Sequence, residues 1–75
     1  MMDIFERVES ILIKYIPDSK IKLEDHLLDD FGLDGLAYVE FVMDIEEGFS
    51  IFIDDNDADK FRTVNDIVEY LEIYT

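Results

Sequence analysis

The sequence predicts an all-α domain spanning residues 1–75, with three main helices, one short helix and a long first loop. Three segments repeat apolar residues every three to four positions, the spacing that places side chains on one face of a helix. Proline, glycine or a helix-capping residue bounds each of these segments. The β-prone run at residues 51–53 has no second strand to pair with, and we therefore expect a loop there.

The first helix is expected over residues 3–15, and Pro17 stops it because the proline ring and the missing N–H interrupt helical hydrogen bonding. Asp18 and Ser19 then indicate a turn. The apolar positions of this helix recur at helical spacing: Ile4, Phe5, Val8, Ile11, Leu12 and Tyr15. The connection that follows should pack onto the core because it carries several large apolar side chains: Ile21, Leu23, Leu27, Leu28 and Phe31.

The second helix is expected from its N-cap, Asp34, to about Glu47, with Gly48 as the C-terminal stop. One side of it forms a core stripe: Tyr38, Phe41, Val42, Ile45 and Phe49. The opposite side combines apolar residues with carboxylates: Leu36, Val39, Glu40, Met43, Asp44, Glu46 and Glu47. This combination favours a docking surface, in which apolar contacts supply affinity and carboxylates steer the partner. Scattered surface apolar residues, or a helix buried on two sides, are the alternative interpretations.

A short helical turn is expected within residues 55–61, and the last helix is expected to begin after Thr63. Thr63 and Asp66 resemble a capping box, with Asp in place of the usual Glu or Gln. The apolar residues of the last helix then repeat toward the C-terminus: Val64, Ile67, Val68, Leu71 and Tyr74.

The composition excludes several classes of protein. Cysteine is absent, which rules out disulfides, thiolate zinc sites and cysteine nucleophiles. No apolar run approaches the ~20 residues of a membrane span, and the first residues do not resemble a secretion signal. We expect a cytoplasmic protein that acts as a monomer.

The charge of the chain is strongly negative and unevenly distributed. Twenty acidic residues against six basic ones give a net charge of −14, and residues 23–59 contain thirteen acids and no Lys or Arg. Phosphates would be repelled, so nucleic acid and anionic membranes are disfavoured as partners. A basic protein surface is favoured through electrostatic steering. The alternative is an acidic surface that serves solubility alone.

Residues 30–49, DFGLDGLAYVEFVMDIEEGF, resemble the central segment of the acyl carrier protein family. In that family an Asp-Leu-Gly-x-Asp-Ser-Leu motif opens an acidic recognition helix that ends in Glu-Glu-x-Phe. Residues 53–64 are similar to the family's third-helix region and to the Thr-Val that starts its last helix. The resemblance covers essentially the whole chain. It implies a four-helix bundle whose second helix is read by partner enzymes.

The sequence departs from the family motif at the position where the family attaches its cofactor, and this departure decides the function that we expect. The family attaches 4′-phosphopantetheine to the Ser of Asp-Ser-Leu, and Gly35 stands at that position between Asp34 and Leu36. Glycine has no side-chain nucleophile, so the cofactor cannot be attached there. Other hydroxyls do not substitute, since Ser19, Ser50 and Thr63 belong to other segments and Tyr38 falls on the core stripe. A glycine in the first helical turn is also expected to cost up to ~1 kcal/mol relative to alanine.

The favoured interpretation is a non-enzymatic, carrier-like protein without a cofactor. It would bind the basic surfaces of carrier-reading enzymes, of transferase, synthase or ligase type, in fatty-acid, polyketide or related acyl-transfer pathways. One alternative is a genuine acyl carrier with an inactivating Ser-to-Gly change, whether natural or introduced. Others are an acidic decoy that binds a basic protein, and a resemblance in fold alone.

Signals for a metal site or for catalysis are weak. Alternating acids match the first ligand positions of an EF-hand loop: Asp55, Asp57 and Asp59. Lys60 replaces the glycine that the loop requires, and Asp66 at the twelfth position is shorter than the usual Glu. We therefore expect no specific metal site and only weak association of divalent cations with the three acids. His26, the only histidine, has no partner set for a metal or a triad.

Overall fold

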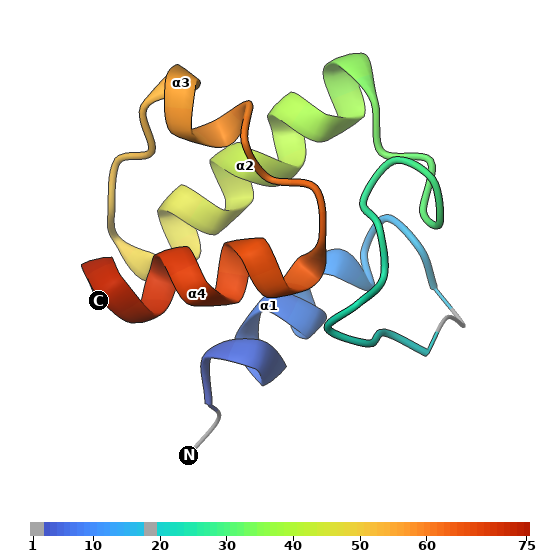
Figure 1. The fold of residues 1–75 in the computed structure, drawn as a ribbon, viewed down its shortest axis with the longest axis horizontal. Coiled ribbons are helices and arrows are strands. Elements are labelled where there is room, and N and C mark those ends of the chain that lie inside the picture. The colour runs from blue at the N-terminus through green and yellow to red at the C-terminus, as the bar shows by residue number, and fades with distance from the viewer. Residues whose placement is uncertain (1–2, 18–19) are drawn as a thin grey trace.

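The computed structural model describes residues 3–17 and 20–75, so the turn expected at residues 18–19 lies outside the described residues. Four helices occur in the described part: α1 (Ile4–Leu12), α2 (Gly35–Phe49), α3 (Asp55–Ala58) and α4 (Val64–Tyr74). Helix α1 packs against both α2 and α4. Figure 1 shows the long first loop on one side of these helices and α3 on the other. The predicted class, with three main helices, one short helix and a long first loop, is confirmed.

Helix α1 begins with a complete capping box. The amide of Glu6 donates to Asp3 Oδ1 at 2.8 Å, and the amide of Asp3 donates back to Glu6 Oε1 at 3.3 Å. The helix ends at Leu12, three residues earlier than predicted. Tighter turns follow before Pro17, in which the amides of Tyr15 and Ile16 donate to the Leu12 carbonyl at 2.9 and 3.1 Å.

Helix α2 continues through Gly48, so the prediction that this glycine stops the helix is wrong. The left-handed residue that ends it is Ser50, with φ of 56°, whose amide donates to the Glu46 carbonyl. Gly48 instead allows close packing on α1, because a Cβ there would lie 3.1 Å from Ile11 Cδ1. Arg7 of α1 reinforces this contact: its guanidinium donates to the Gly48 carbonyl at 2.5 Å and lies 4.0 Å from the centre of the Phe49 ring.

The hydrophobic core takes side chains from every helix and from the first loop. Its largest inaccessible members are Val8, Leu12, Leu27, Phe41, Ile45, Val64, Ile67 and Leu71. The core stripe predicted for α2 is confirmed, with Phe41, Ile45 and Phe49 buried and Tyr38 and Val42 half-buried. None of the helices in the described residues is both long enough and apolar enough to cross a membrane.

The first loop is held to the start of α4 by main-chain hydrogen bonds. The Leu27 amide donates to the Arg62 carbonyl at 2.9 Å, and the Val64 amide donates to the Asp25 carbonyl at 3.0 Å. Ile21 and Leu27 are buried as expected, and Phe31 is half-buried. The expectation is wrong for Leu23 and Leu28, which are exposed. Once the main chain directs Leu27 inward, its neighbour Leu28 faces outward.

The second half of the molecule follows its predicted outline. Residues 51–53 form a loop, and the Asp54 side chain caps the short helix α3 by accepting from the Asn56 amide at 3.0 Å. The predicted capping box of α4 is confirmed. The Asp66 amide donates to Thr63 Oγ1 at 3.2 Å, while the Thr63 amide donates to Asp66 Oδ2 at 3.1 Å. These caps fix the residues at which α3 and α4 start.

Candidate functional site

The start of α2 is shaped by a tight turn in the first loop. The amide of Gly32, at φ +69°, donates to the Leu28 carbonyl at 2.8 Å, and the Leu33 amide donates to the Leu27 carbonyl at 3.0 Å. Leu33 is thereby buried, and the chain leaves the turn extended at Asp34. Asp34 occupies the predicted N-cap position, but its side chain makes no capping hydrogen bond.

Gly35 adopts a backbone conformation that favours glycine. Its φ of +50° lies in the left-handed region, which costs an L-residue about 1–2 kcal/mol. No atom lies within 4 Å of the place where a Cβ would be built, so the obstacle to a side chain is backbone strain rather than crowding. The expectation that glycine is unfavourable in this first turn is therefore wrong, because it assumed a right-handed helical residue.

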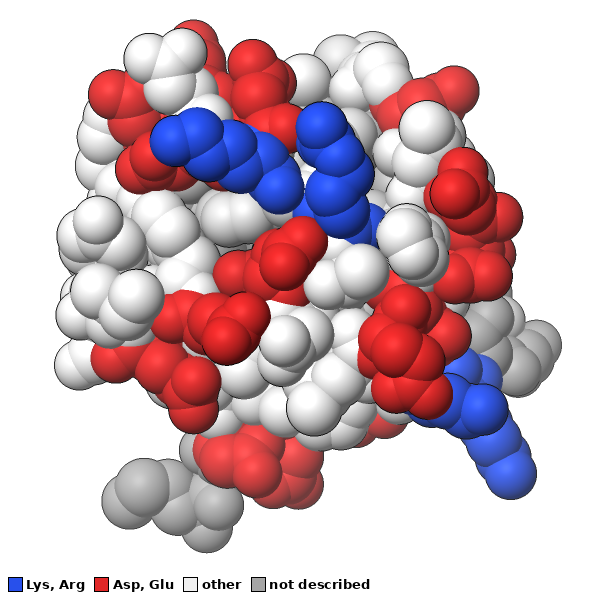
Figure 2. Space-filling model, in the orientation of Figure 1, with Lys and Arg blue, Asp and Glu red and all other residues white. Residues whose placement is uncertain are grey.

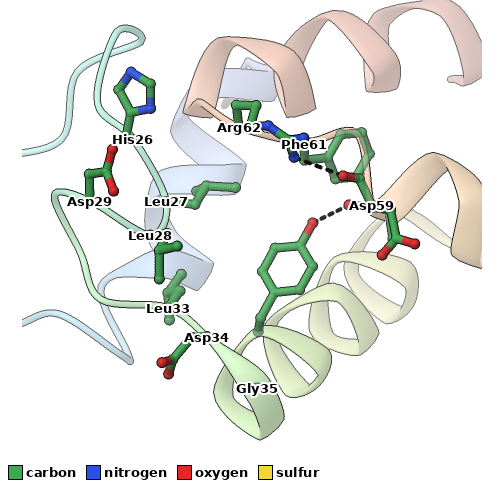
Figure 3. A pocket seen from close by; sticks show the side chains of 12 residues that line it. His26, Leu27, Leu28, Asp29, Leu33, Asp34, Gly35, Asp59, Phe61 and Arg62 are labelled. Atoms are coloured by element: carbon green, nitrogen blue, oxygen red, sulfur yellow. Dashed lines mark hydrogen bonds between the residues drawn. The ribbon is translucent and has the colours of Figure 1, made fainter.

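A shallow cavity of about 330 Å³ opens beside Gly35. Figure 3 shows leucines of the first loop on one side of it and Phe61 and Arg62, from the segment before α4, on the other. Its apolar wall consists of Leu27, Leu28, Leu33, Ala58 and Phe61, and its polar groups belong to His26, Asp29, Asp34, Tyr38, Asp59 and Arg62. The cavity thus offers apolar surface directly beside Gly35.

Tyr38 carries the one hydroxyl among the side chains that line this cavity. This hydroxyl donates to the main-chain carbonyl of Ala58, joining α2 to α3. Burial, together with the charge of Asp59, raises the pKa of Tyr38 to about 12. At neutral pH the phenol is therefore protonated and engaged in this hydrogen bond, which makes it a poor nucleophile.

The outer face of α2 is exposed, as the two-sided pattern predicted. Leu36 is 72% exposed, Val39 51% and Met43 56%, so these side chains are not part of the core. Glu40 and Glu47 are exposed beside them. The alternative of a helix buried on two sides is thereby excluded. We refer to this set, Leu36, Val39, Glu40, Met43 and Glu47, as the α2 outer face.

Two other carboxylates predicted at the edge of this face have partners within the chain. Asp44 Oδ2 accepts a hydrogen bond from the Tyr15 hydroxyl at 2.5 Å, which is the main reason that the pKa of Tyr15 is raised to about 12. Glu46 Oε2 accepts from the amide of Ile53 at 2.7 Å. Both acids are half-buried and hold neighbouring segments against α2. Helical spacing alone did not indicate these structural roles.

Phe52 adjoins the α2 outer face and was not among the contact residues predicted from the sequence. Its ring is 83% exposed, and it lines two surface depressions together with Met43. Alternation along Ile51-Phe52-Ile53 was the available signal, since successive residues of an extended segment point to opposite sides. Ile53 is buried, and Phe52 correspondingly faces out.

The acids that resemble an EF-hand loop are not arranged as ligands. In residues 3–17 and 20–75, no three His, Asp or Glu side chains gather as a metal site requires. Asp57 Oδ2 accepts from the Tyr70 hydroxyl at 3.0 Å, and Asp66 is engaged in the α4 capping box. Figure 2 shows acidic side chains spread widely over one face of the molecule, with few basic ones among them.

Comparisons with known proteins agree on one family. The family described as "Phosphopantetheine attachment site" matches residues 3–71. An acyl carrier protein of Helicobacter hepaticus is 40% identical over 73 residues, covering 95% of this chain and 96% of the relative. One from Thermotoga maritima is 42% identical over 72 residues, covering 93% and 89%. One from Bdellovibrio bacteriovorus is 43% identical over 74 residues, covering 95% and 94%.

The fold is similar to a solved structure as well. A chain from Mycobacterium tuberculosis, provisionally assigned as an acyl carrier protein, superposes with a TM-score of 0.90 at 25% identity, covering 96% of this chain and 99% of that one. The sequence and fold comparisons thus point to the same conclusion. The chain belongs to the acyl carrier protein family, whose members are carrier proteins and not enzymes.

Proposed function

We propose that the protein acts by docking to enzymes that read acyl carrier proteins, without carrying a 4′-phosphopantetheine group itself. Members of its family interact with acyl-handling enzymes. The observation that carries the proposal is the pairing of Gly35, in a left-handed backbone, with an exposed α2 outer face immediately after it. Under this proposal the chain lacks the attachment chemistry, whereas the surface that follows Gly35 presents exposed apolar and acidic residues.

The residues around Gly35 do not fit a covalently attached cofactor. Glycine offers no side-chain oxygen, and the Tyr38 hydroxyl in the adjoining cavity is hydrogen-bonded to the Ala58 carbonyl and has a raised pKa. No attachment step is therefore derived for this chain. Asp34 and Leu36 still flank the position, and we assign them to recognition of the partner rather than to chemistry.

The chemistry of the α2 outer face defines the partner. Its apolar residues would contact an apolar patch, and Glu40 and Glu47 would face Lys or Arg at the rim of that patch. A carrier-reading transferase, synthase or ligase with a basic docking surface meets this description. The charge of residues 23–59 disfavours nucleic acid and anionic membranes. We propose that residues 1–75 act as a single monomeric domain in this role.

The test separates docking from modification. The protein is incubated with coenzyme A, Mg²⁺ and a broad-specificity phosphopantetheinyl transferase, and the intact mass and the binding to the transferase are both measured. We expect measurable, salt-sensitive binding with no change in mass. A gain of the phosphopantetheine mass would show that another nucleophile exists and would contradict the proposal.

A genuine carrier with an inactivating change is the second candidate, and the identities of 40–43% to acyl carrier proteins favour it. The φ of Gly35 favours the first candidate, because a backbone suited to serine is expected in the right-handed region. The third candidate, an acidic decoy that binds a basic protein in place of nucleic acid, is disfavoured. Exposed apolar side chains occupy the middle of the acidic face, where a decoy would present carboxylates.

A further inference from the structure

Phe52 is held outward by the main chain on both sides of it. The amide of Ile51 donates to the Glu46 carbonyl at 3.1 Å, and the amide of Ile53 donates to the Glu46 side chain at 2.7 Å. Ile53 is buried, so the segment is fixed and its middle residue faces solvent. At 83% exposure, Phe52 is the most exposed large hydrophobic side chain in the described residues. A large aromatic side chain that an ordered main chain directs into solvent is typical of an interaction site rather than of the hydrophobic core.

The exposed ring is continuous with the α2 outer face. A groove of about 470 Å³ runs between α2 and α3 and has Val39, Met43 and Phe52 among its walls. A smaller depression joins Phe52 to Met43 and Glu47. Leu36, Val39 and Met43 share one side of α2 at spacings of three and four residues. The apolar surface therefore extends from the start of α2, across the groove, to the connection before α3.

Carboxylates border this extended surface. Asp55 and Asp59 line the groove on the α3 side, and Glu47 lies beside the depression next to Phe52. No Lys or Arg occurs between residues 23 and 59. A second copy of the chain, with a net charge of −14, would be repelled from such a surface. The complementary occupant is a protein surface that presents an apolar side chain flanked by Lys or Arg.

We propose that Phe52 is an aromatic anchor of the docking surface, and that the groove between α2 and α3 receives an apolar side chain from a basic surface of the partner enzyme. This inference rests on the proposed function, because it assigns the partner to the same class of enzyme. It adds a contact outside α2 and makes the α2–α3 connection part of the recognition surface. Buried aromatic residues near the middle of an interface commonly dominate its affinity.

The first experiment measures binding kinetics to the phosphopantetheinyl transferase, a ketosynthase and an acyl-carrier ligase, each immobilised separately. Phe52→Ala should speed dissociation about tenfold with little change in association, as the loss of a buried apolar contact does. Ile73→Ala is the matched control, because Ile73 is 77% exposed on α4 and lies outside both depressions. It should bind like the original protein. Thermal melts of both variants should match the original melt.

The second experiment observes position 52 directly. The chain contains no Trp, so Phe52→Trp labelled with 5-fluorotryptophan gives one fluorine NMR signal. This signal should shift and broaden when the partner enzyme is added, while the signal of Ile73→Trp should stay near its free position. An unchanged signal at position 52 within a formed complex would overturn the proposal.

The outcomes distinguish this inference from the proposed function. If Met43→Ala weakens binding and Phe52→Ala does not, the α2 outer face docks and the assignment of Phe52 is wrong. If neither variant alters binding, the partner uses another surface: the assignments of Phe52 and of the α2 outer face are then wrong, while docking itself stands. If the original protein binds none of the three enzymes, the proposed function fails, and the assignment of Phe52 fails with it.

Discussion

At the scale of single residues, Gly35 differs from a serine in two ways: it has no side-chain hydroxyl, and its backbone is left-handed. A left-handed first residue lets α2 start directly after the extended Asp34, without a side-chain cap. A serine at this position must either accept strain or rotate the chain into the right-handed region. Replacement of this glycine therefore tests the chemistry and the conformation together.

Gly35→Ser is predicted to restore modification at least in part and to lower the free energy of unfolding by about 1–2 kcal/mol. Asp34 and Leu36 still flank this position, and under the proposed function the α2 outer face should still recruit the transferase. Intact mass after incubation with coenzyme A and transferase checks the first part, and urea melts check the second. Gly35→Ala is the control, since it should be strained to a similar extent and never modified.

The opposite outcome is equally informative. If Gly35→Ser is well folded but unmodified by any transferase, the docking surface has diverged from that of working carriers. If Gly35→Ser and Gly35→Ala are both as stable as the original protein, the first turn of α2 adapts without strain.

At the scale of elements, α2 has one side buried in the core and one exposed side, and the proposed docking uses the exposed one. Met43→Ala is predicted to speed dissociation from the partner by an amount equivalent to about 1–2 kcal/mol, because an apolar contact is lost. Glu47→Lys should instead slow association and flatten its salt dependence, since steering is long-range and screened over about 8–10 Å. Both variants should keep the original stability within about 0.5 kcal/mol.

Phe41→Ala is the control for the inner side of α2. Phe41 is fully buried, and its truncation should cost about 3–5 kcal/mol of folding stability. Unfolding by Met43→Ala, with unchanged binding by the folded fraction, would place Met43 in the core and refute docking through this face.

Three tyrosine hydroxyls join one element to another. Tyr15 donates to Asp44 of α2, Tyr38 donates from α2 to Ala58 of α3, and Tyr70 donates from α4 to Asp57 of α3. The pKa of each is raised to about 12: mainly by the hydrogen bond to Asp44 for Tyr15, and mainly by burial for Tyr38 and Tyr70. These bonds require the protonated phenol.

Stability is therefore predicted to fall at alkaline pH. The folded tyrosines hold their protons above pH 10, where unfolded tyrosines release them, so the folded state binds more protons in that range. The stabilisation is complete below about pH 10 and is lost as pH rises toward about 12. Absorbance titration at 295 nm, with melts at matched pH, checks this. Ionisation of all four tyrosines near pH 10 in the folded protein would contradict it.

The sequence predicted the elements of this fold better than their ends and connections. Apolar periodicity and the capping pair Thr63–Asp66 are local signals, and they located the helices and the two sides of α2. The role of Gly48 depends on contact with Ile11, and the outward position of Phe52 depends on hydrogen bonds to Glu46. Such contacts form only when the chain has folded and brought separate segments together, so the spacing of apolar residues along a helix does not reveal them.

At the scale of the whole molecule, the net charge of −14 opposes compactness. Almost all of the excess lies in residues 23–59, which include α2 and α3. The folded state brings these carboxylates closer together than the unfolded chain does. Any cation that associates more strongly with the folded state will therefore stabilise it.

Divalent cations are predicted to raise the thermal midpoint at low ionic strength. A weak site with a dissociation constant of about 2 mM would give about 1 kcal/mol at 10 mM Mg²⁺, or roughly 4–8 °C for a domain of this size. The acids expected to contribute most are Asp55, Asp57 and Asp59, which fall within four residues of one another. Melts in Mg²⁺ or Ca²⁺ are compared with melts in Na⁺ at the same ionic strength, and Asp55→Asn/Asp59→Asn serves as the control in which the gain should shrink. Equal midpoints in all three salts would mean that screening alone acts. A sub-micromolar affinity for Ca²⁺ would instead require an ordered loop, which the engagement of Asp57 with Tyr70 and of Asp66 in its capping box argues against.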